Sequence, residues 1–280
     1  MISIIICSRN IILFDKLKES IENTIGEVVY EIIKLDNLTI NESITKVYNR
    51  GLAIAKYELL LFVHEDVVFH TSNWGNILST IFNQNLNIGL LGIAGTKYKS
   101  KYPSAFWHTK IDNLFIHVLQ HYKSRKPQVD KLGFKEKKLE KVVAIDGVFL
   151  ALRKSINVKF NEKIKGFHCY DLGLSVDVIE SNYDVMVTDQ ILIEHFSIGN
   201  TNLDFVKGVL EFHFLYKNKL STFLGNKEYD LDTLALERFL GVCYENRFIP
   251  FKLWMIYFFR RPFHRLNLNL FKLVAYKIRK

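Results

Sequence analysis

The segment from residue 59 to residue 66 is the pattern that most restricts how this chain can fold. Five large apolar residues, 59–63, are followed at once by His64, Glu65 and Asp66. An apolar run with no polar alternation is typical of a central strand that helices cover on both faces. Ligands of open α/β sheets bind at the carboxyl ends of such strands. The segment therefore predicts a buried strand that ends at a ligand site.

The three polar residues do not by themselves identify that ligand. On an extended backbone, residues two apart point the same way, so His64 and Asp66 would face one side and Glu65 the other. A histidine and a carboxylate on one side suit a metal ion or a phosphate. A solvated, acidic strand end fits the same three residues, and both interpretations stay open at this point.

The preceding residues predict a β-α-β-α order that leads into this strand. Residues 2–7 and 28–35 are rich in β-branched side chains, and apolar residues recur at helical spacing within residues 11–25. Thr39 and Glu42 have the spacing of a capping box, which predicts the start of a second helix. Such alternation is typical of an α/β sheet.

Further elements are expected after residue 66. Helices are expected at 74–82 and from Asp171. Strands are expected at 88–94, 142–152 and 184–193, and Gly95 is expected to close the first of them. Residues 96–140 have weak periodicity, so we expect an elaborated loop region with a short helix around residues 113–121. From Leu203 onward the pattern is helical, and no linker rich in glycine or proline announces a second domain.

The positive charge is concentrated at the C-terminus. The formal net charge is +9, and nine of the 38 Lys and Arg residues lie in 247–280, which contains no Asp or Glu. Residues 1–246 therefore carry equal numbers of basic and acidic side chains. The segment 247–280 is also aromatic, which fits an interfacial anchor on an anionic membrane. A C-terminal helix packed on the body is the alternative. Nucleic acid is not expected, because a nucleic-acid binder would line a groove with charge.

Cysteine usage and hydropathy indicate the compartment. The 3 cysteines are odd in number and form no C-x-x-C pair and no cluster at zinc spacing, which fits a reducing cytosol. The apolar run at residues 2–7 is followed by a charge at Arg9, so it is too short for a signal peptide. The sequence has no run of about 18 apolar residues, so a membrane-spanning helix is not expected. We expect a cytoplasmic protein, peripheral on the inner face of the cytoplasmic membrane.

Three ionisable residues stand at predicted element ends where a crevice would lie. Asp66 follows one strand, Asp171 begins a helix, and His195 follows a later strand. Each has a plainer interpretation, since Asp171 makes a good helix N-cap and His195 fits a surface loop. Taken singly, none identifies an active site.

Several short motifs follow one another in order along residues 1–200. They are Cys7-Ser8-Arg9-Asn10, the strand end at Asp36, Tyr48-Asn49-Arg50-Gly51, residues 61–67, residues 146–153, and Phe167-His168-Cys169-Tyr170-Asp171. This succession resembles the GT-A glycosyltransferases, family 2-like, and more narrowly the branch in which His-x-Asp replaces Asp-x-Asp. The resemblance implies an α/β, Rossmann-like fold with a mixed sheet flanked by helices. Residues 1–200 would be the catalytic domain, 96–140 its variable acceptor-side region, and 201–280 a helical extension.

The resemblance also implies roles for the matching positions. The implied donor contacts are Asp36, which reads the base, Ser8 and Arg9, which lie beneath the nucleoside, and Asn49, His64 and Asp146. Asp66 matches the metal-binding carboxylate, and His195 matches the later histidine that approaches the metal or the diphosphate. Asp171 matches the catalytic base. The chain departs from the family pattern at His64, which replaces a carboxylate, and at Tyr170, where many relatives have Glu.

These residue types suit an inverting transfer of a sugar. Mn²⁺ or Mg²⁺ bound by Asp66 would offset charge on the leaving nucleoside diphosphate, and Asp171 would take the proton of the attacking hydroxyl. The expected partners are a nucleotide-sugar donor and a glycan or lipid-linked acceptor, in the synthesis of a bacterial surface polysaccharide or lipooligosaccharide.

Two other functions remain as alternatives. A sugar nucleotidylyltransferase shares the general fold but needs a glycine-rich basic loop after the first strand, and residues 7–11 lack one. A membrane-associated binding protein with a degenerate site is the non-enzymatic alternative, because His64 stands in place of an acid. In the 96–140 region, the aromatic and histidine side chains around Trp107 fit either acceptor binding or a plain surface loop.

Overall fold

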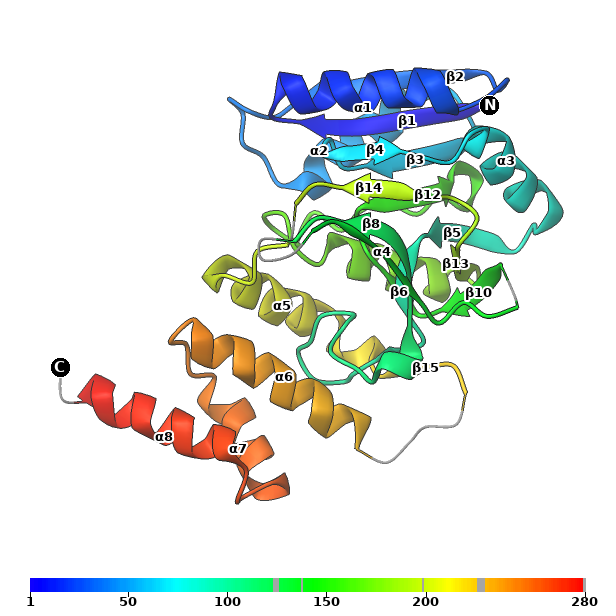
Figure 1. The fold of residues 1–280 in the computed structure, drawn as a ribbon. Coiled ribbons are helices and arrows are strands. Elements are labelled where there is room, and N and C mark those ends of the chain that lie inside the picture. The colour runs from blue at the N-terminus through cyan, green and yellow to red at the C-terminus, as the bar shows by residue number, and fades with distance from the viewer. Residues whose placement is uncertain (123–125, 137, 198, 226–229, 279–280) are drawn as a thin grey trace.

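The protein is built from two main sheets, a two-stranded pair and helices that cover the sheets, with a separate group of helices at the C-terminal end (Figure 1). This computed structural model describes residues 1–122, 126–136, 138–197, 199–225 and 230–278. The alternation of strands and helices over the first 65 residues is as the sequence predicts. The fold class is therefore mixed α/β, with a helical C-terminal extension.

The larger sheet is mixed. In order across the sheet its strands are β10 (Leu139–Val142), β13 (Asp184–Thr188), β5 (Ile88–Gly92), β12 (Phe149–Arg153), β3 (Leu59–Val63), β1 (Ile2–Ser8) and β2 (Tyr30–Asp36). Strand β1 runs parallel to both β2 and β3, whereas β12 is antiparallel to β3 and β5. The predicted central strand is β3, and all of its residues are buried.

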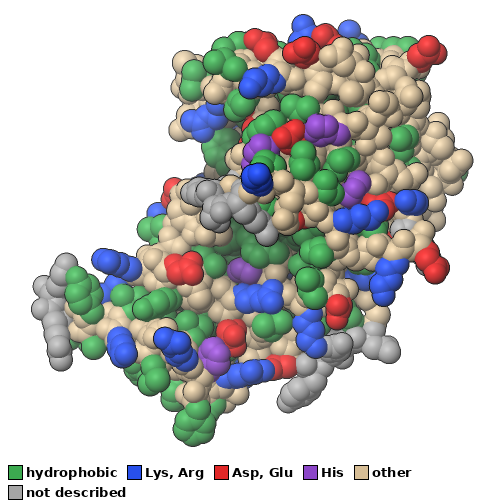
Figure 2. All heavy atoms as spheres, in the orientation of Figure 1, with side chains coloured by type: hydrophobic (Ala, Val, Ile, Leu, Met, Phe, Trp, Pro, Cys, Tyr) green, Lys and Arg blue, Asp and Glu red, His purple; other side chains and the backbone are tan. Residues whose placement is uncertain are grey.

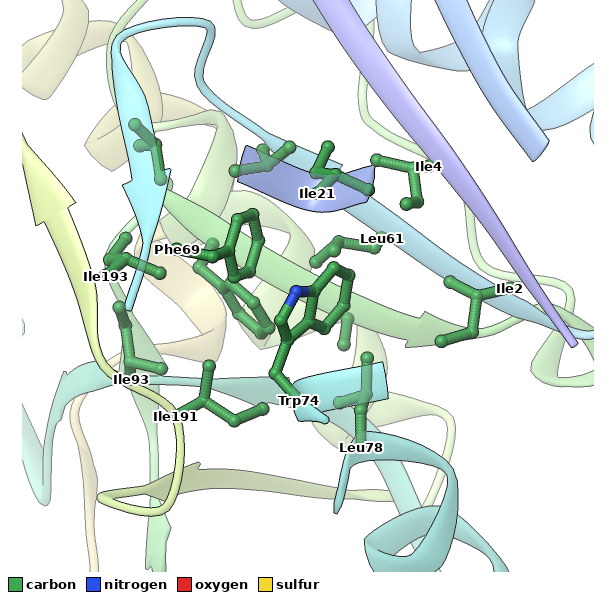
Figure 3. Packing of buried hydrophobic residues seen from close by; sticks show 14 of the residues in the cluster. Ile2, Ile4, Ile21, Leu61, Phe69, Trp74, Leu78, Ile93, Ile191 and Ile193 are labelled. Atoms are coloured by element: carbon green, nitrogen blue, oxygen red, sulfur yellow. The ribbon is translucent and has the colours of Figure 1, made fainter. Parts of the chain in front are cut away.

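Helices cover both faces of this sheet, which is why its central strands are apolar throughout. Helices α1 (Ile11–Thr24) and α3 (Trp74–Gln84) pack on one face, and α2 (Ile44–Ile54) and α4 (Tyr170–Glu180) pack on the other. In the first layer, Phe69 and Trp74 stack with their ring centroids 4.2 Å apart (Figure 3). Alternate residues of a strand face opposite ways, so Ile4 joins the first layer and Ile5 the second.

The smaller sheet brings segments from distant parts of the chain to the edge of the site. Its strands in order are β11 (Ala144–Ile145), β6 (Ala94–Thr96), β8 (Leu114–Gln120), β14 (Ile193–His195) and β4 (Val67–Phe69), and β9 (Gln128–Leu132) pairs with β8. Strand β15 (Thr222–Phe223) pairs with β7 (Tyr98–Lys99). The antiparallel pairing of β14 with β4 places His195 opposite Val67.

The region 96–140 differs from the prediction, because several strands run through it. The helix expected at residues 113–121 is wrong: a short 3-10 turn (η1, Ile111–Asn113) leads into strand β8, which pairs with β6, β9 and β14. Its buried residues Leu114, Phe115 and Val118 have a spacing that a helix would share. Pairing with three neighbouring strands, which the local pattern does not contain, decides the outcome.

Other boundaries also differ. Helix α2 begins at Ile44, not at a capping box: the side chain of Asn37 bonds to both backbone groups of Glu42 and holds that segment as a turn. The strand expected at 142–152 is divided between the two sheets, and so is the one expected at 184–193. Gly95 does not close a strand but lies within β6, paired with Ile145.

The first C-terminal helices pack onto the α/β body, and the later ones pack onto the earlier ones. They are α5 (Leu203–Tyr216), α6 (Leu231–Glu245), α7 (Phe251–Arg260) and α8 (Arg265–Ile278), and short 3-10 turns lie at Lys154–Ile156 and Lys217–Lys219. Helices α5 and α6 share a buried cluster with α4 and β6, while α7 and α8 pack against α6 through Trp254, Tyr257 and Leu270. In Figure 1 they extend away from the end of the molecule that carries α1.

The last two helices are only partly covered. Trp254 and Tyr257 are buried, yet Phe259 is 80% and Phe263 99% exposed. Figure 2 shows hydrophobic and basic side chains interspersed on this part of the surface. Among the described residues, no helix is both long and apolar enough to cross a membrane.

Candidate active site

Three side chains that the sequence singles out come together at the ends of β3, β4 and β14. His64 and Asp66 lie in the turn between β3 and β4, and the pairing of β14 with β4 adds His195. The Asp66 carboxylate lies 3.6 Å from His195 Nε2 and 4.0 Å from His64 Nδ1. One ligand atom from each residue lies within 4.8 Å of the other two. The arrangement can hold a metal ion.

The donor chemistry of this cluster fits a divalent transition metal. A carboxylate is a ligand for Mg²⁺ and Mn²⁺ alike, whereas imidazole nitrogen favours first-row transition metals. Two imidazoles with one carboxylate therefore fit Mn²⁺ better than Mg²⁺. Three protein ligands would leave coordination positions for substrate oxygens or water.

The electrostatics of the cluster also suit a cation. Burial raises the pKa of the Asp66 carboxyl, but the hydrogen bond and charge of His195 and the charge of His64 outweigh it and hold that pKa well below its ordinary value. Burial, and then the charge of His195, lower the pKa of His64. An ionised carboxylate and a neutral imidazole are the forms that bind metal.

Asp171 lies in the first turn of α4 and faces the same cavity from the other side. Its Oδ1 accepts a hydrogen bond of 2.8 Å from the Leu172 backbone N–H. Burial, and then the negative charge of Asp146, raise the pKa of Asp171 to about 7. A carboxyl with that pKa can take up and release a proton near neutral pH, which is what a general base does.

The cavity between these groups has a volume of about 210 Å³. Its lining includes Asp171, Asp146, His64 and His195. Its aromatic lining residues are Phe106, Trp107, Phe167, His168, Tyr170 and Phe205. The proposed base and two of the proposed metal ligands, His64 and His195, therefore open onto one space, while Asp66 lines an adjoining pocket.

A second pocket of about 240 Å³ adjoins this cavity on the β1 side, and His64 and Phe167 line both. Arg9 lies over the Phe167 ring, 5.4 Å from its centroid. The carboxylate of Glu65 accepts hydrogen bonds from the backbone N–H groups of Arg9 and Asn10, at 2.9 and 3.0 Å. Glu65 thus fixes the loop after β1, a role that its place beside His64 did not reveal.

Of the predicted donor residues, Arg9, His64 and Asp146 line these pockets, and Ser8, Asp36 and Asn49 do not. Ser8 is buried at the end of β1, opposite the exposed Asp36 at the end of β2. Asn49 points elsewhere: its side chain bonds to the backbone N–H and C=O of Phe160 and to Glu162, and holds the segment after β12. Its predicted donor contact finds no support in this placement.

Some site residues were not identified as such from the sequence. Tyr170 was noted only as a departure from the family pattern. Its hydroxyl oxygen lies 2.7 Å from His64 Nε2. Trp107, for which the sequence left acceptor binding and a plain surface loop both open, lines the cavity and stacks on Phe205 with ring centroids 5.7 Å apart. His108, by contrast, is buried and accepts a bond from the Ala105 N–H, so it supports the loop. The sequence contains no signal that pairs α5 with Trp107.

Comparison with known proteins identifies the family and the fold. A sequence profile described as "Glycosyltransferase like family" matches residues 3–198. No curated protein sequence matches the chain significantly.

Solved structures share the fold at low sequence identity. GalNAc-T7, solved with UDP, GalNAc and Mn²⁺, has a TM-score of 0.52 and 11% identity over 91% of this chain, which spans 56% of that one. TarS 1–349 from S. aureus has a TM-score of 0.52 and 13% identity over 87% of this chain and 72% of its own. The complex of TarS 1–349 with UDP-GlcNAc gives the same TM-score of 0.52 at 12% identity. The chain thus spans little more than half the length of the first of these relatives, and the likeness extends to the GT-A fold alone.

Proposed function

The chain belongs to the glycosyltransferase-like family, and from that premise we propose that it moves a sugar from a nucleotide-sugar donor to an acceptor hydroxyl with inversion. One observation carries the proposal. Two partly buried carboxylates, Asp66 and Asp171, line adjoining pockets that share His64 and Phe167, and their surroundings shift their pKa values in opposite directions. Groups tuned apart in this way are the expected partners in acid–base and electrostatic catalysis.

The proposed step is a single displacement. The acceptor oxygen attacks the anomeric carbon, its proton passes to the Asp171 carboxylate, and the bond from the anomeric carbon to the diphosphate oxygen breaks with its electron pair leaving on the diphosphate. Attack opposite to the leaving group inverts the anomeric centre. The general-base contribution is typically about 10²–10⁴-fold.

Asp66, His64 and His195 are the residues that would hold Mn²⁺. When bound, the ion would supply positive charge that offsets the charge developing on the leaving diphosphate. Arg9 and the Glu65-bound loop after β1 would hold the nucleotide, with Asp36 at the edge of the base.

The donor is proposed to be a UDP-sugar, and the acceptor a glycan or a lipid-linked glycan. Support for the donor comes from the similar structures, which hold UDP or UDP-GlcNAc. Residues 1–200 would form the catalytic domain and 201–280 the extension. The region 96–140 would be the acceptor side, because Phe106 and Trp107 line the cavity.

Donor turnover tests the function directly. The protein with Mn²⁺ is given a panel of nucleotide sugars, beginning with UDP-sugars, and the released products are separated. Release of a nucleoside diphosphate is the expected result. Formation of pyrophosphate or of a nucleoside triphosphate would indicate a sugar nucleotidylyltransferase, and no product from any donor would indicate a binding protein.

The C-terminal helices are proposed to bind an anionic membrane surface, which would bring the site to a lipid-linked acceptor. Phe259 and Phe263 are exposed, and residues 247–280 contain no acid. Within the described chain, Lys252, Arg265 and Lys272 are exposed and have no ion pair. Aromatic side chains enter the interface, and each Lys or Arg near an anionic surface contributes about 1 kcal/mol.

Vesicle flotation of the full-length protein tests this surface. We expect binding to vesicles of phosphatidylglycerol mixed with phosphatidylcholine, weak binding to phosphatidylcholine alone, and a loss of binding in Phe259→Ser/Phe263→Ser. The matched control is Leu86→Ser, since Leu86 is 72% exposed on the α/β body. Equal flotation of the tail variant and the control would exclude this surface as the anchor.

A further inference from the structure

Tyr170 stands next to the proposed base in the chain, but its hydroxyl reaches the metal side of the site. The hydroxyl oxygen lies 2.7 Å from His64 Nε2 and donates to the backbone C=O of Gly147 at 3.1 Å. Tyr170 is only 4% exposed. The Tyr170 side of the contact is therefore shielded from water, which strengthens a hydrogen bond, while the His64 side chain stays partly exposed.

The Gly147 carbonyl gives this short chain of hydrogen bonds one arrangement in which every group is paired. A carbonyl oxygen only accepts, and a tyrosine hydroxyl has one proton to give. With that proton donated to Gly147, the hydroxyl accepts from His64, and His64 Nε2 carries a hydrogen. In a neutral imidazole the other nitrogen, Nδ1, then has the free lone pair. Nδ1 is the atom that lies 4.0 Å from the Asp66 carboxylate.

Three segments hold this geometry in place. A side chain at Gly147 would not fit, because its Cβ would lie 2.2 Å from the Tyr170 hydroxyl oxygen. The ring of Tyr170 packs against Tyr48, with centroids 5.8 Å apart, and against Phe160. The His64 backbone N–H bonds to Val148 C=O, beside Gly147, at 3.3 Å.

We propose that Tyr170 is a positioning residue, which keeps His64 in the Nε2–H form so that Nδ1 faces the metal. The proposal rests on the metal-binding role of His64 in the proposed function. The two positions at which the chain departs from the family pattern, His64 and Tyr170, are thus the two partners of one hydrogen bond. Because Tyr170 and Asp171 are neighbours in the first turn of α4, this turn would connect the metal ligand His64 to the proposed base, Asp171.

The tautomer is measured first, on metal-free protein at a pH where His64 is neutral. Nitrogen chemical shifts of the His64 ring, assigned by loss of the signals in His64→Gln, distinguish the two forms. We expect the wild-type ring to be wholly Nε2–H, and Tyr170→Phe to contain a substantial Nδ1–H population. The matched control is Tyr48→Phe, because Tyr48 is a fully buried neighbour whose hydroxyl has no hydrogen-bond partner. A wild-type ring in the Nδ1–H form would overturn the proposal even if Tyr170→Phe failed to fold.

Mn²⁺ affinity is measured next, by calorimetric titration with the ion alone. Loss of a group that orients a metal ligand typically weakens binding about 10–100-fold, and we expect that loss in Tyr170→Phe but not in Tyr48→Phe. Unchanged Mn²⁺ affinity in Tyr170→Phe, or an unchanged tautomer, would overturn the proposal. If wild-type protein bound no Mn²⁺, the metal role in the proposed function would fail, while the tautomer measurement would still show whether Tyr170 orients His64.

Discussion

Two adjoining pockets of the site carry the same functional group in opposite electrostatic settings. On the metal side, Asp66 lies among two imidazoles, which keep its carboxyl ionised against the effect of burial. On the helix side, Asp171 faces the charge of Asp146 in a buried place, and its pKa is raised to about 7. The difference shows that the surroundings of each carboxyl, and not its residue type, determine its role. Asp66 is suited to hold a cation, and Asp171 is suited to exchange a proton.

Replacing Asp171 by Asn gives the largest expected effect, because it removes the proton acceptor while keeping the oxygen that bonds to Leu172. We expect turnover to fall about 10²–10⁴-fold. Affinity for the nucleoside diphosphate with Mn²⁺ should stay near the wild-type value, since the nucleotide is proposed to lie in the pocket on the β1 side, which Asp171 does not line. The measurements are steady-state rates and calorimetric titration. Near-normal turnover would remove Asp171 from the base role.

Replacing Asp66 by Ala tests the metal side of the comparison. The remaining ligands would be two neutral imidazoles, so we expect Mn²⁺ affinity to fall at least about tenfold, and binding of UDP to lose its dependence on Mn²⁺. Titration of UDP with and without Mn²⁺ measures both. If Asp66→Ala and the wild-type protein bound Mn²⁺ equally well, the assignment of the metal side would be wrong.

The pH dependence of kcat/KM sharpens the assignment on the helix side. Asp171 must be deprotonated to accept a proton, so activity should rise with pH through about 7. Because the negative charge of Asp146 contributes to the raised pKa, Asp146→Asn should move this rise to lower pH. A rise that stays at the same pH in Asp146→Asn would mean that another group controls it.

The smallest expected effect concerns stability. A buried carboxyl with a raised pKa favours the protonated folded state, so its contribution is full below the ordinary Asp pKa of 3.8 and is lost as pH rises toward about 7. Asp171→Asn avoids that loss. Its Tm should therefore match the wild-type Tm at pH 4 and exceed it by a few degrees at pH 8, as thermal unfolding at both pH values can show. If the Tm difference between Asp171→Asn and the wild-type protein did not increase with pH, the result would argue against a buried Asp171 carboxyl that becomes charged as pH rises.

Much of the fold follows from local pattern. The unbroken apolar run of β3 and the helix expected from Asp171, which begins at Tyr170, were both recognisable, because burial and periodicity depend on a few consecutive residues. The order of the short motifs was enough to predict the GT-A fold and the family, and both predictions are confirmed. Strand β8 shows where local pattern fails, since its apolar spacing also fits a helix and only its neighbouring strands decide.

The sequence by itself determined which side chains could do chemistry: His64, Asp66, Asp171 and His195 each follow or begin an element where a crevice was expected. Only the tertiary structure decided which of them meet. The register of β14 against β4 brings His195 to Asp66, and the fit of Tyr170 over Gly147 joins it to His64. Periodicity indicates on which side of its own helix or strand a residue lies. Contacts between distant segments depend on sheet register and helix packing, which no short stretch of sequence contains.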